Sequence, residues 1–318
     1  MPQPIFLVGI QRSGTTWLAN LLGEHSQIAS VTHPKHFGAH ESCYFECIYG
    51  RYGDLASQAN YVEFVEVMSA SDFFVLAGAD KEFLYNLYPA TYEQVFRKVM
   101  DALAEREGKQ LWIEKSPEHT LHMTEIAEYY PDARFVAIQR DARQQIGSEL
   151  KMLAVREDEQ KRERRLRLVI RSILRWAYYK RVIDEYEKSS NRIYVIQYSH
   201  LSQDTETELR RLSDFLGIEF EESMLLGRFE RNTSFAEKSQ REKALSRSEE
   251  LLITYLSRLI SLLPTSIIRA IHNKLHTSKS QRPLPKWFFR ISRNSDREEM
   301  LQTNNEDASD RKFGRSAE

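Results

Sequence analysis

Near its start the chain carries the stretch IFLVGIQRSGTTWLANLL at residues 5–22, which restricts the possible folds more than any other part of the sequence. Residues 5–10 are an almost unbroken apolar run, the pattern of a strand buried on both faces of a parallel sheet. A glycine-bearing turn follows, and then a helical pattern from about Gly14 to Gly23. Loop amides that lead into a helix N-terminus favour a phosphate ligand. The stretch therefore predicts a strand, a phosphate-binding loop and a helix.

Further strands and helices alternate along the chain. Apolar runs at 111–114, 134–139 and 192–198 predict three more strands, each separated from the next by a helical pattern. We expect helices at roughly 58–69, 91–107, 119–130, 141–154, 161–188 and 203–216, the last with Asp204 as N-cap and Gly217 as its end. This alternation predicts a P-loop-like three-layer α/β fold, in which helices flank a central parallel sheet and the ligand lies at the carboxyl ends of the strands.

Two segments fall outside the alternation. Residues 30–54 are rich in histidine, glycine and aromatic residues without a clean period, so we expect a loop that covers the site. After about Pro283 the chain becomes polar and charged, which predicts disorder. The expected organisation is one domain at residues 1–282 and a polar tail at 283–318.

Composition narrows the class of protein. A formal net charge of −1 over 318 residues gives no basic field for non-specific nucleic-acid binding. The two cysteines, Cys43 and Cys47, are too few for a disulfide framework and need further ligands to form a metal site. No apolar run reaches membrane-spanning length, and the first strand begins too early to leave room for a signal peptide. We expect a soluble, cytoplasmic protein.

The loop itself departs from that of a nucleoside triphosphatase. Gly9 and Gly14 have the Gly-x-x-x-x-Gly spacing, but Thr15 stands where the lysine that neutralises the β- and γ-phosphates belongs. The cation comes earlier, at Arg12, whose guanidinium can reach phosphate oxygens. The loop thus indicates a phosphate ligand without a γ-phosphate. A tight glycine turn with a solvated arginine is the structural alternative.

The sequence RSGTTW at residues 12–17 closely resembles the 5′-phosphosulfate-binding loop of the sulfotransferases that use 3′-phosphoadenosine 5′-phosphosulfate (PAPS). The resemblance implies that Arg12 is the loop cation and that Trp17 stacks on adenine, although packing in the helix core is equally consistent with a tryptophan there. It also implies that the 5′-phosphate is held by the rest of the loop, Ser13, Gly14, Thr15 and Thr16.

A second signature, RFVAIQRDARQQIGSEL, places Arg140 at the end of a strand and Ser148 eight residues later. This resembles the 3′-phosphate clamp of the same family. A strand end can deliver a bidentate cation, and one or two turns of helix then return a hydroxyl to the same phosphate. Residues 192–218 resemble the late strand and helix of the family, where Tyr198 is expected to be structural. The resemblance extends from residue 5 to about 220.

A third signature is LWIEKSPEHTLHM, which resembles the Glu-Lys-Ser/Thr-Pro segment of glycan-modifying and bacterial sulfotransferases. By this resemblance Lys115 stabilises charge on the leaving 5′-phosphate or on the sulfuryl oxygens. A strand-end salt bridge between Glu114 and Lys115 is the structural alternative.

Transfer of a sulfuryl group to an acceptor hydroxyl also needs a general base. Glu41 best resembles the glutamate that follows the first helix in tyrosine-sulfating and many bacterial members. Four nearby residues compete for this role: His33, His36, His40 and Glu46. Their spacing is not diagnostic of zinc, and we expect no metal.

The resulting hypothesis is a metal-independent, PAPS-dependent sulfotransferase whose acceptor hydroxyl belongs to a carbohydrate, lipid or phenol. The charged run at 156–176 is either a core helix with a solvated face or a helix whose Arg162, Arg165 and Arg171 offer a positively charged surface to an acidic glycan. One alternative is a P-loop kinase or NTPase without the usual lysine, with Glu114 as its strand-end carboxylate. A non-catalytic nucleotide-binding module is another.

Overall fold

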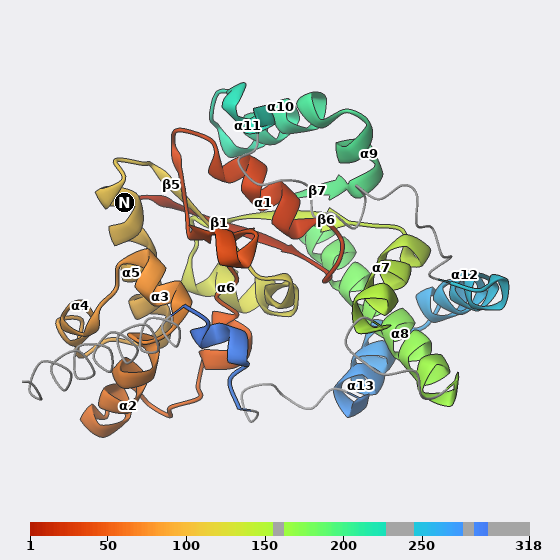
Figure 1. Cartoon of the computed structure of the whole chain (residues 1–318), viewed down its shortest axis with the longest axis horizontal. Coiled ribbons are helices and arrows are strands. Elements are labelled where there is room, and N and C mark those ends of the chain that lie inside the picture. Colours follow the sequence, from red (N-terminus) through yellow and green to blue (C-terminus); the bar gives the residue numbers. More distant parts are fainter. Residues whose placement is uncertain (155–161, 227–244, 276–282, 292–318) are drawn as a thin grey trace, which may run out of the picture.

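The computed structural model describes residues 1–154, 162–226, 245–275 and 283–291 (Figure 1). Its centre is a five-stranded sheet in which every neighbouring pair is parallel and the strand order is β2-β5-β1-β6-β7. The strands are β1 (Gln3–Gly9), β2 (Ile28–Ser30), β5 (Leu111–Lys115), β6 (Arg134–Gln139) and β7 (Ile193–Gln197). The predicted three-layer α/β fold is confirmed, and the four predicted strands are present. The three-residue β2 was missed because it is too short to show a pattern.

Most predicted helices are present, with small shifts at their ends. They are α1 (Thr15–Gly23), α2 (Gln58–Met68), α5 (Tyr92–Arg106), α7 (Ala142–Ala154), α8 (Arg162–Ser189) and α10 (Thr205–Leu216). The helix expected at 119–130 is a 3₁₀ segment, η3 (Pro117–His122), followed by α6 (Met123–Tyr129). Helices that the sequence did not predict are α3 (Asp72–Ala77), α4 (Lys81–Tyr85), α9 (Tyr198–Gln203), α11 (Ser223–Leu226), α12 (Arg247–Ser261) and α13 (Thr265–Leu275).

Helix α10 begins and ends where its sequence predicts. The Asp204 carboxylate accepts a hydrogen bond from the backbone N–H of Thr207 at 3.1 Å. At the other end Gly217 has a φ of +73°, which a glycine adopts without steric cost.

The helices cover both faces of the sheet because alternate residues of β1 are apolar on both sides. Phe6 and Val8 belong to the core that α2, α3, α5 and α6 cover, whereas Ile5 and Leu7 pack on the face covered by α1 and α10 (Figure 1). A third core joins α7, α8, α12 and α13. In the part of the chain that the structure describes, no helix is both long and apolar enough to cross a membrane.

Residues 30–54 contain more regular structure than the loop that we expected. They form a short hairpin of β3 (Thr32–His33) and β4 (Gly38–Ala39) around a 3₁₀ turn, η1 (Pro34–His36), and then a π-helical turn, η2 (Tyr44–Ile48). Tyr44 and Phe45 are buried, and the Tyr44 ring is tilted against the Phe96 ring of α5, with centroids 4.6 Å apart. These aromatic residues draw the segment into the core, because burying a large ring removes 150–250 Å² or so from water.

The beginning of the predicted tail also packs on the domain. Residues 283–291 contain a 3₁₀ turn, η6 (Lys286–Phe289), in which Phe288 is buried and Trp287 packs against the main core. The described part of 283–318 is therefore ordered on the surface of the domain rather than a disordered tail. Residues 292–318 lie outside the described residues.

Candidate functional site

The predicted phosphate loop joins β1 to α1 and is closed by its own hydrogen bonds. Ser13 donates its backbone N–H and its hydroxyl to the Ile10 carbonyl, at 3.1 and 2.7 Å. Both Ser13 donors are thus used inside the loop. The amides of Gly14, Thr15 and Thr16 begin α1, where backbone N–H groups have no acceptor within the helix.

Gly14 is required by its surroundings as well as by its backbone. Its φ is +105°, and a Cβ there would lie 2.8 Å from Cδ2 of Tyr198. The Tyr198 ring contacts Trp17 edge-on, with centroids 5.8 Å apart, and lies 4.2 Å below the Arg140 guanidinium. Tyr198 therefore packs between the loop and the end of β6.

Residues far apart in the sequence hold the loop in place. Thr120 of η3 accepts a hydrogen bond from the Gly9 amide at 2.8 Å, and Gln145 of α7 donates to the Gln11 carbonyl at 2.7 Å. The Gln11 side chain donates to the buried carboxylate of Glu118. These three hydrogen bonds could not be predicted from the sequence, since the two residues that form each of them lie more than a hundred positions apart.

The two halves of the predicted donor site meet at Arg12. Its Nε donates to the Ser148 hydroxyl at 3.2 Å, and its carbonyl accepts a hydrogen bond from Arg140 Nη1 at 3.1 Å. Burial and the neighbouring Arg12 charge lower the pKa of Arg140. Two guanidinium groups and a hydroxyl thus converge at the carboxyl ends of β1 and β6, an arrangement that suits a phosphate.

A cavity of about 280 Å³ adjoins this cluster at the ends of β6 and β7. Arg140, Trp176, Gln197 and Tyr198 are among the residues that line it. The Trp176 indole donates to the Arg140 carbonyl at 3.0 Å, which fixes the end of β6 against α8. Trp176 and Gln197 had no signal in the sequence, because a helical or strand pattern does not reveal which side chains face a ligand.

Lys115 connects the loop to the candidate base. From the end of β5 its Nζ lies 3.1 Å from the Thr16 hydroxyl and 2.8 Å from the Glu41 carboxylate. Only 4% of the Lys115 side chain is exposed, whereas 27% of the Glu41 side chain is, so the carboxylate side of this ion pair remains open to solvent. The structure therefore brings together the cation, the phosphate loop and the candidate base that the sequence suggested.

Glu114 points away from Lys115, so the alternative strand-end salt bridge between them is not formed. Successive residues of a strand point to opposite faces, and Glu114 lies on the other side of the sheet. There it accepts hydrogen bonds from Ser42 at 2.6 Å and His119 at 2.8 Å. Burial raises the pKa of Glu114, but His119 and the hydroxyl donors outweigh it and lower the pKa overall.

The other candidate bases have different partners. His36 Nε2 lies 3.0 Å from Asp72 Oδ2, and the ring of His40 stacks on His36 at 3.7 Å. His40 is buried, and burial lowers its pKa to about 2. Glu46 pairs with His122 at 3.0 Å, while His33 accepts a hydrogen bond from the Lys35 amide. Among the described residues, side chains of metal-ligand type meet in two groups: His36, His40 and Asp72, and Glu41, Cys43 and Glu118.

Two of the three arginines suggested on α8 have side chains that the structure describes. Arg165 pairs with Glu249 of α12 at 2.6 Å and ties the two helices together. Arg171 is exposed, and the Arg162 side chain lies outside the described residues.

Comparison with known proteins gives one family and several similar folds. The model of the sulfotransferase family matches residues 4–222, which include all the site residues above from Arg12 to Tyr198. The comparison with curated proteins found no match.

Three solved structures with similarity to this chain differ in sequence identity, TM-score and the share of each chain that is covered. A sulfotransferase from Alicyclobacillus acidocaldarius is 17% identical, with a TM-score of 0.48, over 90% of this chain and 98% of that one. The sulfotransferase domain from the curacin biosynthetic pathway is 18% identical, with a TM-score of 0.45, over 93% and 98%. A mouse sulfotransferase complexed with adenosine 3′,5′-bisphosphate (PAP) is 14% identical, with a TM-score of 0.46, over 85% of this chain and 88% of that one.

Proposed function

Because this chain belongs to the sulfotransferase family, we propose that it transfers the sulfuryl group of PAPS in line to an acceptor hydroxyl, without a metal ion. One observation carries the proposal. Lys115 Nζ lies 2.8 Å from the Glu41 carboxylate and 3.1 Å from the Thr16 hydroxyl, so a base, a cation and the phosphate loop meet at one point. The family shows the class of enzyme, and this geometry supports the roles of the individual residues.

The donor is held at both of its phosphates. The amides that begin α1, together with the Thr15 and Thr16 hydroxyls, hold the 5′-phosphosulfate, and Arg140 and Ser148 hold the 3′-phosphate. Arg12 serves both, since it contacts Ser148 and lies in the loop. For Trp17, the edge-on contact with Tyr198 favours packing over adenine stacking.

In the transfer step the acceptor hydroxyl attacks sulfur and its proton passes to Glu41. The new bond joins the acceptor oxygen to sulfur, while the bond from sulfur to the bridging oxygen of the 5′-phosphate breaks. The leaving nucleotide, adenosine 3′,5′-bisphosphate (PAP), retains that bond's electron pair. Lys115 and Arg12 stabilise the negative charge that develops there, a role that preorganised cations perform without reorganisation.

The kinase alternative is less well supported. It requires a strand-end carboxylate that faces the loop to hold Mg²⁺. Glu114 is engaged on the opposite face of β5 with Ser42, Ser116 and His119.

Incubation of the purified chain with radiolabelled PAPS and fractionated host extract tests the proposal. We expect label in an acceptor fraction with the wild-type protein and almost none with Glu41→Gln. Calorimetry with PAP and with ATP and Mg²⁺ supplies the second measurement. Binding of ATP and Mg²⁺ without binding of PAP would show that the proposed donor is incorrect.

A further inference from the structure

We propose that the β3–β4 hairpin and residues 283–291 form a subsite for a negatively charged group on the acceptor. This inference rests on the proposed function and adds the class of acceptor. The subsite, called the cationic rim below, consists of Lys35 and Phe37 from the hairpin and Lys286, Trp287 and Arg290 from the later segment. Residues 283–291 lie outside the part of the chain that the family model matches.

Asp72 joins the two segments of the cationic rim. Its side chain is completely buried at the start of α3. The carboxylate accepts hydrogen bonds from the backbone N–H groups of Arg290 at 2.9 Å and Ile291 at 3.0 Å, and it lies 3.0 Å from His36 of the hairpin. A buried carboxylate is stable only when such donors replace its water. The later segment is therefore fixed against the hairpin.

The cationic rim borders the candidate base through one residue. The Trp287 indole lies edge-on to the His40 ring, with centroids 5.8 Å apart. His40 immediately precedes Glu41 in the chain. An acceptor that spans His40 would place its hydroxyl at Glu41 and another of its groups on the rim.

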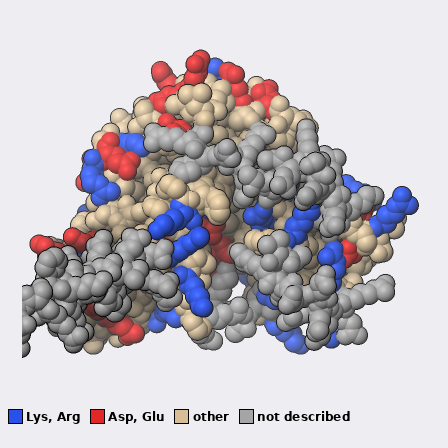
Figure 2. All heavy atoms as spheres, in the orientation of Figure 1, with Lys and Arg blue, Asp and Glu red and all other residues tan. Residues whose placement is uncertain are grey.

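Three cations of the rim have no acidic partner. Lys35, Lys286 and Arg290 are exposed, and none of them forms an ion pair with a carboxylate in the described ranges. Arg290 donates to the Lys35 carbonyl at 3.0 Å, which keeps these two residues together. Figure 2 shows Lys and Arg side chains gathered on this face, over η1 and η6. Clustered exposed cations attract an anionic ligand.

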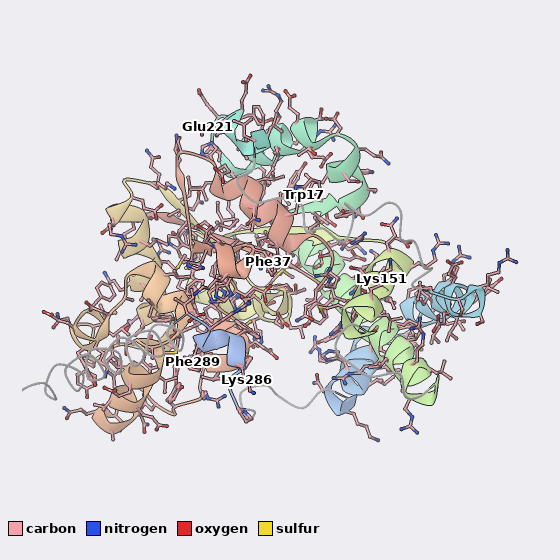
Figure 3. All side chains as sticks on the ribbon, viewed as in Figure 1. Trp17, Phe37, Lys151, Glu221, Lys286 and Phe289 are labelled. Atoms are coloured by element: carbon pink, nitrogen blue, oxygen red, sulfur yellow. The ribbon has the colours of Figure 1, made fainter. Side chains whose placement is uncertain are left out.

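Phe37 adds a flat apolar surface beside these charges. It is 70% exposed and has a φ of +60°, which is rare for a bulky residue. The conformation is held because Asn20 of α1 donates to the Phe37 carbonyl at 3.0 Å. Figure 3 shows Phe37 at the hairpin, with Lys286 and Phe289 on η6 beyond it. Strained residues persist mainly at functional sites, and an exposed ring suits the face of a sugar or an aromatic acceptor.

The rim is a second candidate for the site of an acidic glycan, besides the arginines suggested on α8. Arg165 of that helix is paired with Glu249. Lys35, Lys286 and Arg290, on the hairpin and η6, form no ion pair among the described residues.

Calorimetry on the PAP-loaded protein tests the subsite with two matched pairs of probes. One pair is a chondroitin hexasaccharide and its carboxyl-reduced form, and the other is 4-hydroxyphenylacetate and 4-hydroxyphenethyl alcohol. We expect at least one carboxylated probe to bind about tenfold or more tightly than its neutral partner, with a preference that weakens as salt is added. The pair that responds shows whether the anionic acceptor is a glycan or a small phenol.

The variant that tests the assignment is Lys35→Gln, Lys286→Gln and Arg290→Gln combined, in which only exposed side chains change. It should bind PAP as the wild type does and lose the preference for the carboxylated probe. Lys188→Gln is the matched control, because Lys188 is exposed at the end of α8 near the opposite edge of the sheet.

Two results would overturn the subsite. One is equal or undetectable binding of the carboxylated and neutral probes by wild-type protein that binds PAP normally. The other is a preference that survives in the triple variant. Failure of the wild-type protein to bind PAP would contradict the proposed donor instead, so the two hypotheses fail in distinguishable ways.

Discussion

Arg12 Nε donates to the Ser148 hydroxyl at 3.2 Å, so a residue of the first βα loop and a residue of the helix after β6 form one contact. Arg140 completes the group through its hydrogen bond to the Arg12 carbonyl. A nucleotide with phosphates at both the 3′ and 5′ positions can engage all three residues, whereas one with a single 5′-phosphate cannot.

We therefore expect PAP to bind much more tightly than AMP. A charge-assisted hydrogen bond contributes about 1.5–3 kcal/mol, which corresponds to roughly a tenfold to hundredfold change in affinity. Arg140→Ala should remove most of the preference when both nucleotides are titrated by calorimetry. Arg143→Ala is the matched control, since Arg143 is exposed on the same helix and pairs with Asp141. Equal affinity of the wild-type protein for PAP and AMP would rule out the clamp.

Glu41→Gln tests the base. The substitution preserves the shape of the side chain and its hydrogen bond to Lys115 but removes its basicity. Positioned general bases contribute about 10²–10⁴-fold, so kcat should fall by that factor while PAP affinity changes little. Glu46→Gln, which alters the pair with His122, should keep most of the activity. Loss of PAP binding in Glu41→Gln would indicate that Glu41 organises the loop instead.

Chelation distinguishes sulfuryl transfer from phosphoryl transfer. We expect excess EDTA to leave the initial rate of transfer from radiolabelled PAPS unchanged, because Arg12, Lys115 and the loop amides supply the positive charge that Mg²⁺ provides in kinases. Restoration of a lost rate by Mg²⁺ would support the kinase alternative.

What the sequence predicted best depends on residues close together in the chain. The first strand, loop and helix are contiguous, and Asp204 and Gly217 cap α10 through contacts within a few residues. The resemblance to the family, rather than the spacing of the residues, predicted that Arg12, Arg140 and Ser148 belong to one donor site.

The contacts that could not be predicted join distant elements without a motif. Asp72 binds backbone N–H groups near the end of the described chain, and backbone donors have no sequence signature. Likewise, residues 44–48 read as a loop because their burial depends on α5, which contributes Phe96. Alternation along a strand would have predicted that Glu114 and Lys115 point to opposite faces of the sheet. The sequence predicted a strand only at 111–114, however, so Lys115 was not recognised as part of β5.

His40 makes stability depend on pH. Burial lowers its pKa from 6.5 to about 2, so the unfolded chain binds a proton that the folded protein excludes. The contribution of His40 to the free energy of unfolding is therefore fully present above about pH 6.5, and we expect it to fall by up to about 1.4 kcal/mol for each pH unit below that. Urea unfolding of the wild type and of His40→Asn at neutral and mildly acidic pH measures this, and the variant should lose less stability on acidification.

His122 provides a comparison of opposite sign. Burial lowers its pKa, but the hydrogen bonds to Glu46 and Glu125 outweigh this effect and raise it above 6.5. A raised pKa adds stability below about pH 6.5 that is lost as pH rises through the folded-state pKa. His122→Asn should therefore make acid destabilisation steeper, whereas His40→Asn should make it shallower. Identical pH slopes in both variants would mean that neither histidine controls the acid sensitivity.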